Sequence, residues 1–228
     1  MIEPGDAKRL ASLIANGLIV TRLSLDSNGG DLVEAMRIGE IVRTLQISTI
    51  VKKGNNCASS CFFIFLAGAG RVALGGEFRG NPKSPAGYVG LHRPYLKSPS
   101  GSNQSLERQA IVMKKVKAYL EAYMVPSRLI DLMMSRPSND IYWMTTEDLE
   151  ELGDYPPELE ELYISKCNYD RKLVDQLTSA KRQGDAAQFN FLQDKNREVA
   201  TCIGKLQFSA ELEALPKLKK GWVPPAPF

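Results

Sequence analysis

The hydrophobic and polar positions of the first 51 residues switch between helical and extended patterns. Residues 6–16 and 31–45 place apolar side chains at the spacing of amphipathic helices. Residues 18–25 and 48–51 are β-branched or alternating runs that predict strands. Strands and helices in this order form right-handed βαβ units around a parallel sheet, so we expect an α/β fold.

The next stretch, residues 54–68 (GNNCASSCFFIFLAG), begins small and polar and then becomes almost wholly apolar. This change predicts a buried helix that opens at Ser59 and Ser60. Beyond it, the pattern predicts a strand at 72–74, a Gly/Pro-rich loop at 75–87, a loop at 96–103, helices at 104–124 and 126–134, a strand at 141–144, and a helix that Thr145 caps and Gly153 ends.

From residue 156 onward the sequence is polar, periodic and helical. We expect an antiparallel hairpin of helices 157–182 and 185–214 that turns at Gly184. Cys167 lies 17 residues before this turn and Cys202 lies 18 residues after it, so the two face each other across the hairpin. They form either a disulfide or a pair of buried thiols.

Three regions follow from these patterns: an α/β domain at 1–155, the helical hairpin at 156–216 and an extended Pro-rich tail at 217–228. Residues 1–6 have neither the basic nor the apolar part of a signal peptide. Because the chain looks cut just after a strand, we expect an N-terminal strand and a leader to be absent from it.

The composition of the chain excludes several classes of protein. The 228 residues are 43% hydrophobic and 24% charged, which is typical of a globular protein and excludes a disordered chain. The net charge of +3 is too small to indicate a nucleic-acid partner. The sequence contains no apolar run long enough to span a bilayer. It also contains no nucleotide-binding motif, and we expect neither a metal nor a cofactor.

Residues with candidate catalytic roles lie directly after the predicted strands. Gly29 and Gly30 follow the strand at 18–25, Ser59 and Ser60 follow the strand at 48–51, and His92 follows another extended run. Ligands of open α/β sheets bind at the carboxyl ends of strands. A serine there serves as a nucleophile or only as a helix cap. His92 is the one histidine of the chain, so a mechanism with a histidine base must use it, although a single histidine is more often structural than catalytic.

Four segments together resemble the ClpP/crotonase superfamily: residues 25–32 (LDSNGGDL), 57–60 (CASS), 66–68 (LAG) and 91–94 (LHRP). The greatest similarity is to its serine peptidases. In these enzymes a Gly-Gly turn donates one oxyanion-hole N–H, an Ala-Ser segment carries the nucleophile and a His-x-Pro segment carries the base. The resemblance covers about residues 18–153 and implies a ClpP/crotonase-like fold.

Spacing distinguishes the two serines within this resemblance. Ser59 lies 29 residues after Gly30 and nine residues before Gly68, which is the family's spacing without gaps. Ser60 would need an adjustment on both sides. Ser59 is therefore the expected nucleophile.

The resemblance implies acyl transfer to a serine. Ser59 would attack a peptide carbonyl, His92 would take its proton, and the N–H groups of Gly30 and Ser60 would bind the oxyanion. The third member of the triad would be Asp140, which falls one residue earlier than the family pattern. The expected partners are a peptide or protein substrate and further copies of the chain in a homo-oligomer, and any ATP-driven unfolding would need a separate protein.

Departures from the family leave two alternatives to a peptidase. Asn28 replaces the family's proline, Arg93 replaces its glutamine, and the helical hairpin is an addition. The altered turn at Asn28, the uncertain place of Asp140 in the triad and the added hairpin favour a catalytically inactive binding or scaffold protein. A crotonase-type acyl-CoA enzyme shares the oxyanion-hole logic but has no basic cluster here for the CoA phosphates. Cys57 and Cys61 are either bridged or small buried hydrophobic residues. Oxidised cysteines would favour a periplasmic or secreted location.

Overall fold

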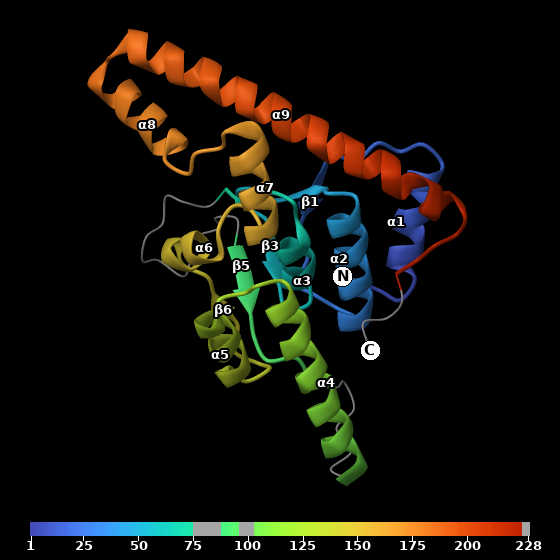
Figure 1. Ribbon diagram of the computed structural model, residues 1–228. Helices are drawn as coiled ribbons and strands as arrows, with labels where there is room; N and C mark the ends of the chain where they lie inside the picture. The colour runs from blue at the N-terminus through green and yellow to red at the C-terminus, as the bar shows by residue number, and fades with distance from the viewer. Residues whose placement is uncertain (75–87, 96–102, 225–228) are drawn as a thin grey trace.

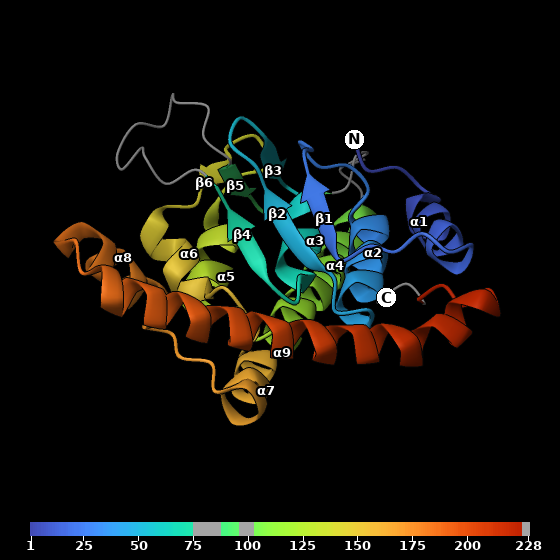
Figure 2. The same cartoon turned by 90° about the horizontal axis from the view of Figure 1, so that it is seen from above.

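The computed structural model describes residues 1–74, 88–95 and 103–224, and their strands form two small sheets (Figures 1 and 2). The first is parallel with the order β1-β2-β4, and the second has the order β3-β5-β6, with β3 and β5 parallel and β6 antiparallel. The fold class is therefore α/β, as predicted, but the strands form two sheets, one of them mixed, where a parallel sheet was expected. The strands are β1 (Arg22–Leu25), β2 (Ser48–Val51), β3 (Asn56–Ala58), β4 (Arg71–Ala73), β5 (Tyr88–Leu91) and β6 (Tyr142–Trp143).

The chain that leaves β1 joins the two sheets. Ser27 N–H donates to the carbonyl of Asn56 at 2.7 Å, and Ala58 N–H donates to the carbonyl of Ser27 at 2.9 Å. The end of the first sheet thus runs alongside β3 of the second. This pairing brings the segment after β1 next to the segment after β3, where the sequence places its candidate residues.

Helices cover the sheets and supply most of the core. The first ones are α1 (Asp6–Ala15), α2 (Leu32–Thr44) and α3 (Cys61–Ala67). Each residue of α3 is at most 4% exposed, which explains why its sequence is apolar all round. Asp31 caps α2 by accepting a hydrogen bond from Glu34 N–H at 2.8 Å. Further along are α4 (Asn103–Ala122), α5 (Ser127–Ser135) and α6 (Thr146–Leu152).

The C-terminal helices correct one prediction. The expected helix 157–182 is divided into α7 (Pro157–Cys167) and α8 (Leu173–Gln183). Asn168 ends α7 in the left-handed region, with φ 54°, a conformation that asparagine tolerates better than most residues. The turn at Gly184, with φ 70°, is confirmed.

The last helix, α9 (Ala186–Lys219), is longer than the predicted 185–214 and ties the hairpin to the α/β body. Its first half packs along α7 and α8, and its second half crosses to α1 and α2, where Ala214 and Leu218 join the main core (Figure 2). Residues 217–219, expected in the extended tail, are therefore helical. The remainder of the expected tail lies partly outside the described residues, which end at 224.

Two further boundaries differ from the predictions. The strand expected at 18–25 begins at Arg22, because Leu18 and Ile19 are exposed and have no partner strand. The strand β3 was not predicted, because it lies in the small, polar beginning of the 54–68 stretch, where the pattern predicts the approach to a helix. The loop expected at 75–87 lies outside the described residues, as does the loop expected at 96–103 except for Asn103, which begins α4.

The structure contains both candidate disulfides, where the sequence left a disulfide or a pair of buried thiols open for each. Cys57 is bonded to Cys61 with a Cα–Cα distance of 5.1 Å, and Cys167 is bonded to Cys202 with a Cα–Cα distance of 5.6 Å. The second bond, the hairpin disulfide from here on, fastens the end of α7 to the middle of α9. Disulfides persist in oxidising compartments, so the pair is compatible with a secreted or periplasmic protein. None of the helices in the described ranges is long and apolar enough to cross a bilayer.

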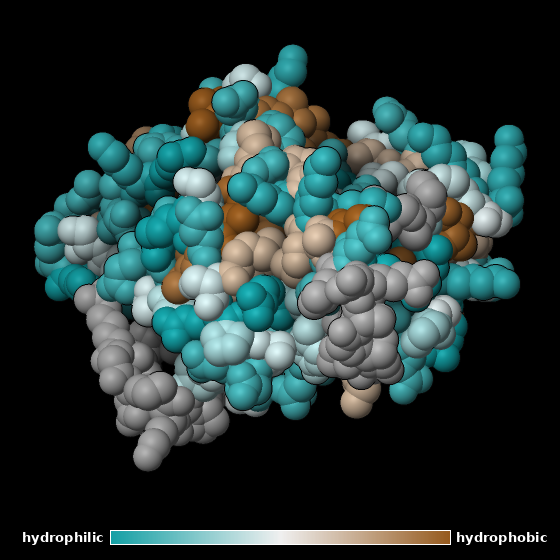
Figure 3. All heavy atoms as spheres, turned by 90° about the horizontal axis from the view of Figure 1, so that it is seen from below, coloured by the Kyte–Doolittle hydropathy of each residue, from teal (hydrophilic) through white to brown (hydrophobic). Residues whose placement is uncertain are grey.

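Large hydrophobic side chains are exposed at separate places on the surface, including Ile19 before β1, Leu74 after β4, and Phe191 and Phe208 on α9. On the face that Figure 3 shows, apolar side chains lie in patches with polar side chains between them. Scattered exposed apolar residues are ordinary on protein surfaces. The expected homo-oligomer stays a prediction.

Candidate active site

Ser59 lies on the sharp turn between β3 and α3, which we call the elbow (residues 58–60). Its φ is +59°, in the left-handed region that costs a residue with a side chain about 1–2 kcal/mol. The surroundings hold this conformation: Ser59 N–H donates to the carbonyl of Gly90 at 2.9 Å, and the carbonyl of Ser59 accepts from Phe62 N–H at 3.0 Å. The serine is partly exposed while its neighbours Ala58 and Ser60 are buried. A strained, accessible serine between a strand and a helix has the geometry of a nucleophile elbow.

Gly29 packs directly against this serine. A Cβ at Gly29 would lie 2.6 Å from Ser59 Cβ and 3.0 Å from Ser59 Oγ, and the φ of Gly29 is +104°. Both the space and the backbone conformation therefore require glycine. The hydroxyl of Ser27 accepts a hydrogen bond from Gly29 N–H at 3.2 Å and stabilises the turn. The Gly-Gly turn and Ser59, 30 residues apart in sequence, thus meet as the pattern predicts.

The two N–H groups expected in the oxyanion hole are those of Gly30 and Ser60. Gly30 lies beside Ile2, whose N–H donates to the carbonyl of Gly29 at 3.0 Å and whose carbonyl accepts from Asp31 N–H at 2.9 Å. Within the part of the chain that the structure describes, neither Gly30 N–H nor Ser60 N–H donates a hydrogen bond. The described residues therefore provide no acceptor that competes with a ligand for either N–H group.

Ser60 does not act as an ordinary helix cap. It precedes α3, yet its side chain accepts no N–H from the first turn of that helix. The residue is 3% exposed, and its Oγ has no hydrogen-bond partner among the described residues. A buried serine hydroxyl is a poor candidate for attack on an external carbonyl, so the exposure of the two serines agrees with the spacing argument for Ser59.

His92 follows β5, the strand that pairs with β3. The register aligns Ala58 with Gly90, so His92 lies one step beyond the residue opposite Ser59. The imidazole is buried, and its Nδ1 lies 2.9 Å from the carbonyl oxygen of Arg93. A carbonyl oxygen only accepts, so Nδ1 of the neutral ring carries the proton and Nε2 is left as an acceptor. Among the described residues, no hydrogen bond joins His92 to the hydroxyl of Ser59.

Asp140 is not paired with His92 in the structure. One carboxylate oxygen lies 3.1 Å from Arg136 Nη1, and the side chain is 52% exposed. The segment is nevertheless close to the expected place, because Arg93 N–H donates to the carbonyl of Arg136 at 3.2 Å. The group that orients His92 is the carbonyl of Arg93, an acceptor that a residue pattern does not reveal.

A second acid near this region, Asp148, has a structural task. It is 2% exposed and forms a capping box with Thr145 at the start of α6. It also accepts hydrogen bonds from Tyr142 and Arg128. Burial alone raises the pKa of Asp148, but the hydrogen bonds from Arg128, Thr145 and Tyr142 outweigh burial and leave the pKa below its usual value.

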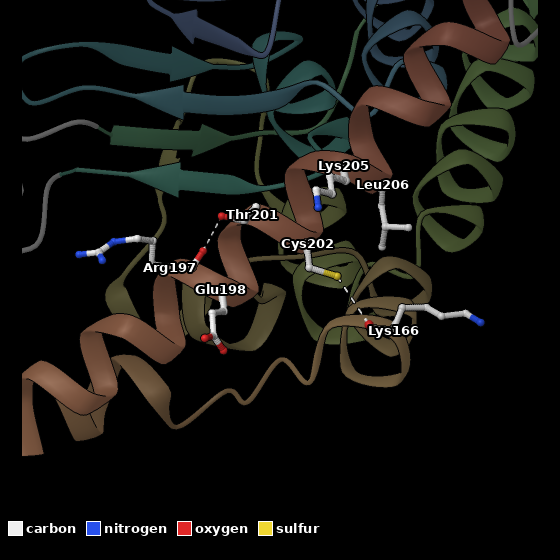
Figure 4. A pocket seen from close by; sticks show the side chains of 7 residues that line it. All are labelled: Lys166, Arg197, Glu198, Thr201, Cys202, Lys205 and Leu206. Carbon is white, nitrogen blue, oxygen red and sulfur yellow. Dashed lines mark hydrogen bonds between the residues drawn. The ribbon is translucent and has the colours of Figure 1, made fainter.

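A pocket on the C-terminal helices is separate from the elbow. It has a cavity volume of about 620 Å³ and lies beside Cys202, between α7 and α9 (Figure 4). Lys166, Lys205 and Arg197 line it with exposed, solvated side chains, and Figure 4 shows Lys166 and Arg197 extending away from it. In the described part of the chain, no group of three His, Cys, Asp or Glu side chains is placed to hold a metal ion.

Comparison with known proteins does not identify a relative: no protein-family model matches the chain, and no curated protein matches it either.

Proposed function

We propose that this protein is a ClpP-like serine peptidase with a ClpP/crotonase-like fold, in which Ser59 is the nucleophile. The observation that carries the proposal is the conformation of Ser59. A non-glycine residue is held at φ +59° on a strand-to-helix turn, partly exposed, with a glycine turn packed against its side chain. Strain of this kind persists at functional sites because it presents a side chain to a ligand.

The chemistry of the surrounding groups supports acyl transfer. With Nδ1 on the carbonyl of Arg93, Nε2 of His92 would take the proton of Ser59 Oγ as that oxygen attacks a peptide carbonyl. The N–H groups of Gly30 and Ser60, which donate to no other described residue, would donate to the oxyanion. His92 would then return the proton to the leaving amine, and water would hydrolyse the acyl-enzyme. The two disulfides support a periplasmic or secreted setting for this reaction.

A fluorophosphonate probe tests the proposal, since it reacts covalently with an activated serine. Wild-type protein should label, and Ser59→Ala should not. The matched control is Ser60→Ala, which removes the neighbouring hydroxyl but keeps the backbone N–H, and which should still label. His92→Ala should lower the labelling rate at least about 100-fold through loss of the general base. Labelling of Ser59→Ala at the wild-type rate would overturn the assignment.

A catalytically inactive scaffold is the second candidate. It is favoured by one specific observation: the described residues contain no hydrogen bond from Ser59 to His92 and none from His92 to Asp140. In this case the free N–H groups would bind a peptide without cleaving it. Saturable binding of unstructured peptides, together with failure of the wild-type protein to label or to hydrolyse them, would favour the scaffold.

A further inference from the structure

The disulfide between Cys57 and Cys61 spans the proposed nucleophile. Cys57 lies in β3, Cys61 is the first residue of α3, and Ser59 is midway between them. Their sulfurs close a ring around the elbow, and we call this bond the elbow disulfide. Cys57 is 0% exposed and Cys61 is 1% exposed, so the bond lies in the core beneath a partly exposed serine.

Ser59 needs such a restraint because its backbone conformation is unfavourable. Left free, a serine would leave φ +59° for the extended or right-handed helical region. Two hydrogen bonds of the Ser59 backbone and the contact with Gly29 oppose this relaxation. The disulfide adds a covalent limit, because it sets the distance between the Cα atoms on either side of the elbow at 5.1 Å.

Loop length argues that the elbow disulfide acts locally. A disulfide lowers the entropy of the unfolded chain more when the loop it closes is longer. Cys57 and Cys61 are four residues apart, whereas the cysteines of the hairpin disulfide are 35 apart. The hairpin disulfide therefore stabilises the whole fold more, and the elbow disulfide has its main effect on the three residues inside its ring.

We propose that the elbow disulfide is a positioning element for Ser59: it holds the serine in the left-handed conformation from which its hydroxyl reacts. This inference rests on the proposed function for its catalytic consequence. Its structural half, that the bond maintains the φ of Ser59, does not depend on catalysis. The two halves have separate measurements.

The experiment uses the two disulfides as a matched pair. Cys167→Ala/Cys202→Ala removes the hairpin disulfide, and Cys57→Ala/Cys61→Ala removes the elbow disulfide. For each protein, the maximal labelling rate and the half-saturating concentration of a fluorophosphonate probe are measured separately. We expect the elbow variant to lose roughly 10- to 100-fold in maximal rate with little change in half-saturation, as misplacement of a reacting group by about 1 Å does. The hairpin variant should label at the wild-type rate.

Equal maximal rates in the two double variants would overturn the catalytic half. Backbone ¹³C chemical shifts of Ser59 test the structural half, because they report its φ directly. They should be those of a left-handed residue in wild type and in the hairpin variant, and should change in the elbow variant. Unchanged shifts in the elbow variant would overturn the structural half, whether or not the wild-type protein labels. Failure of the wild-type protein to label would count against the proposed function alone.

A second experiment applies if the elbow variant does not fold. The hairpin variant contains the elbow disulfide as its single disulfide, and this buried bond is reduced by unfolding the protein in denaturant with a phosphine and refolding it under reducing conditions, after which a thiol count of two reports the reduction. Labelling and the Ser59 shifts are then compared before and after reduction, while circular dichroism verifies that the fold is retained. Loss of labelling with a change in the shifts supports the proposal, and no change in either contradicts it.

Discussion

Gly29→Ala perturbs the candidate site most sharply, and Gly17→Ala is its matched control. Both glycines have nearly the same positive φ, +104° at Gly29 and +100° at Gly17. Alanine at either position must therefore bear the same backbone strain, about 1–2 kcal/mol. The positions differ in what a new Cβ meets. Nothing lies within 4 Å at Gly17, whereas Ser59 Cβ lies 2.6 Å away at Gly29.

The magnitude follows from that contact. Cβ atoms in proteins essentially never approach closer than 3.0 Å, and contacts below 3.4 Å are already tight. Ser59 or the glycine turn must therefore move by several tenths of an ångström up to almost 1 Å. Overpacking of this kind costs about 1–3 kcal/mol beyond the backbone strain. Gly29→Ala should thus lower the free energy of unfolding by about 2–5 kcal/mol, against about 1–2 kcal/mol for Gly17→Ala.

The loss of labelling rate should be of the same order, in free energy, as the difference in stability between the two variants. Displacement of a nucleophile by about 1 Å costs on the order of 100-fold in rate. Fluorophosphonate labelling of Gly29→Ala should therefore be about 100-fold slower than that of wild type, while Gly17→Ala labels normally. Chemical denaturation of both variants verifies that each is folded under the assay conditions. Equal labelling rates for the two variants would refute the claim that Gly29 sets the position of Ser59.

Three further predictions concern the acid, the disulfides and the response to pH. Asp140→Asn should change the labelling rate less than about threefold, because the carboxylate of Asp140 pairs with Arg136 at the surface. Loss of a triad aspartate costs about 10⁴-fold, and a loss of that size would restore Asp140 to the triad. Removal of the hairpin disulfide should lower the free energy of unfolding by about 4 kcal/mol and removal of the elbow disulfide by about 2 kcal/mol, as denaturant titration measures. The elbow variant should thus lose less stability but more labelling rate than the hairpin variant. The folded state holds the pKa of Asp148 below its usual 3.8, so the unfolded state takes up a proton first and stability should fall as the pH drops below about 4. Asp148→Asn should reduce the acid dependence of the melting temperature, and an unchanged dependence would contradict this assignment.

The elements that the sequence could predict are those with a long or strongly marked pattern. The amphipathic helix that became α2 and the parallel strands β1 and β2 were recognisable because many positions repeat one periodicity. The break at Asn168 was not recognisable, since a single residue in the left-handed region ends a helix without changing the composition around it.

The sequence could predict that the glycine turn and Ser59 lie at the same sheet edge, but not the atoms that touch there, and the predicted Asp140 is not paired with His92. Spacing distinguishes Ser59 from Ser60, and the structure supplies an independent reason in the burial of Ser60. The contact of Gly29 with Ser59 depends on a bridge between residues 30 positions apart, which no local pattern encodes. The carbonyl of Arg93 as the partner of His92 was equally hidden, because every residue has a carbonyl group.

The most direct test of the account maps the probe adduct on the wild-type protein. After reduction, alkylation and digestion with trypsin, cleavage at Lys53 and Arg71 releases residues 54–71, the peptide that contains both elbow serines. Fragment ions in the mass spectrometer assign the phosphonate to one residue. The account predicts an adduct on Ser59. An adduct on Ser60 or on a serine outside this peptide, or the absence of any adduct from active-site-directed probes, would contradict it.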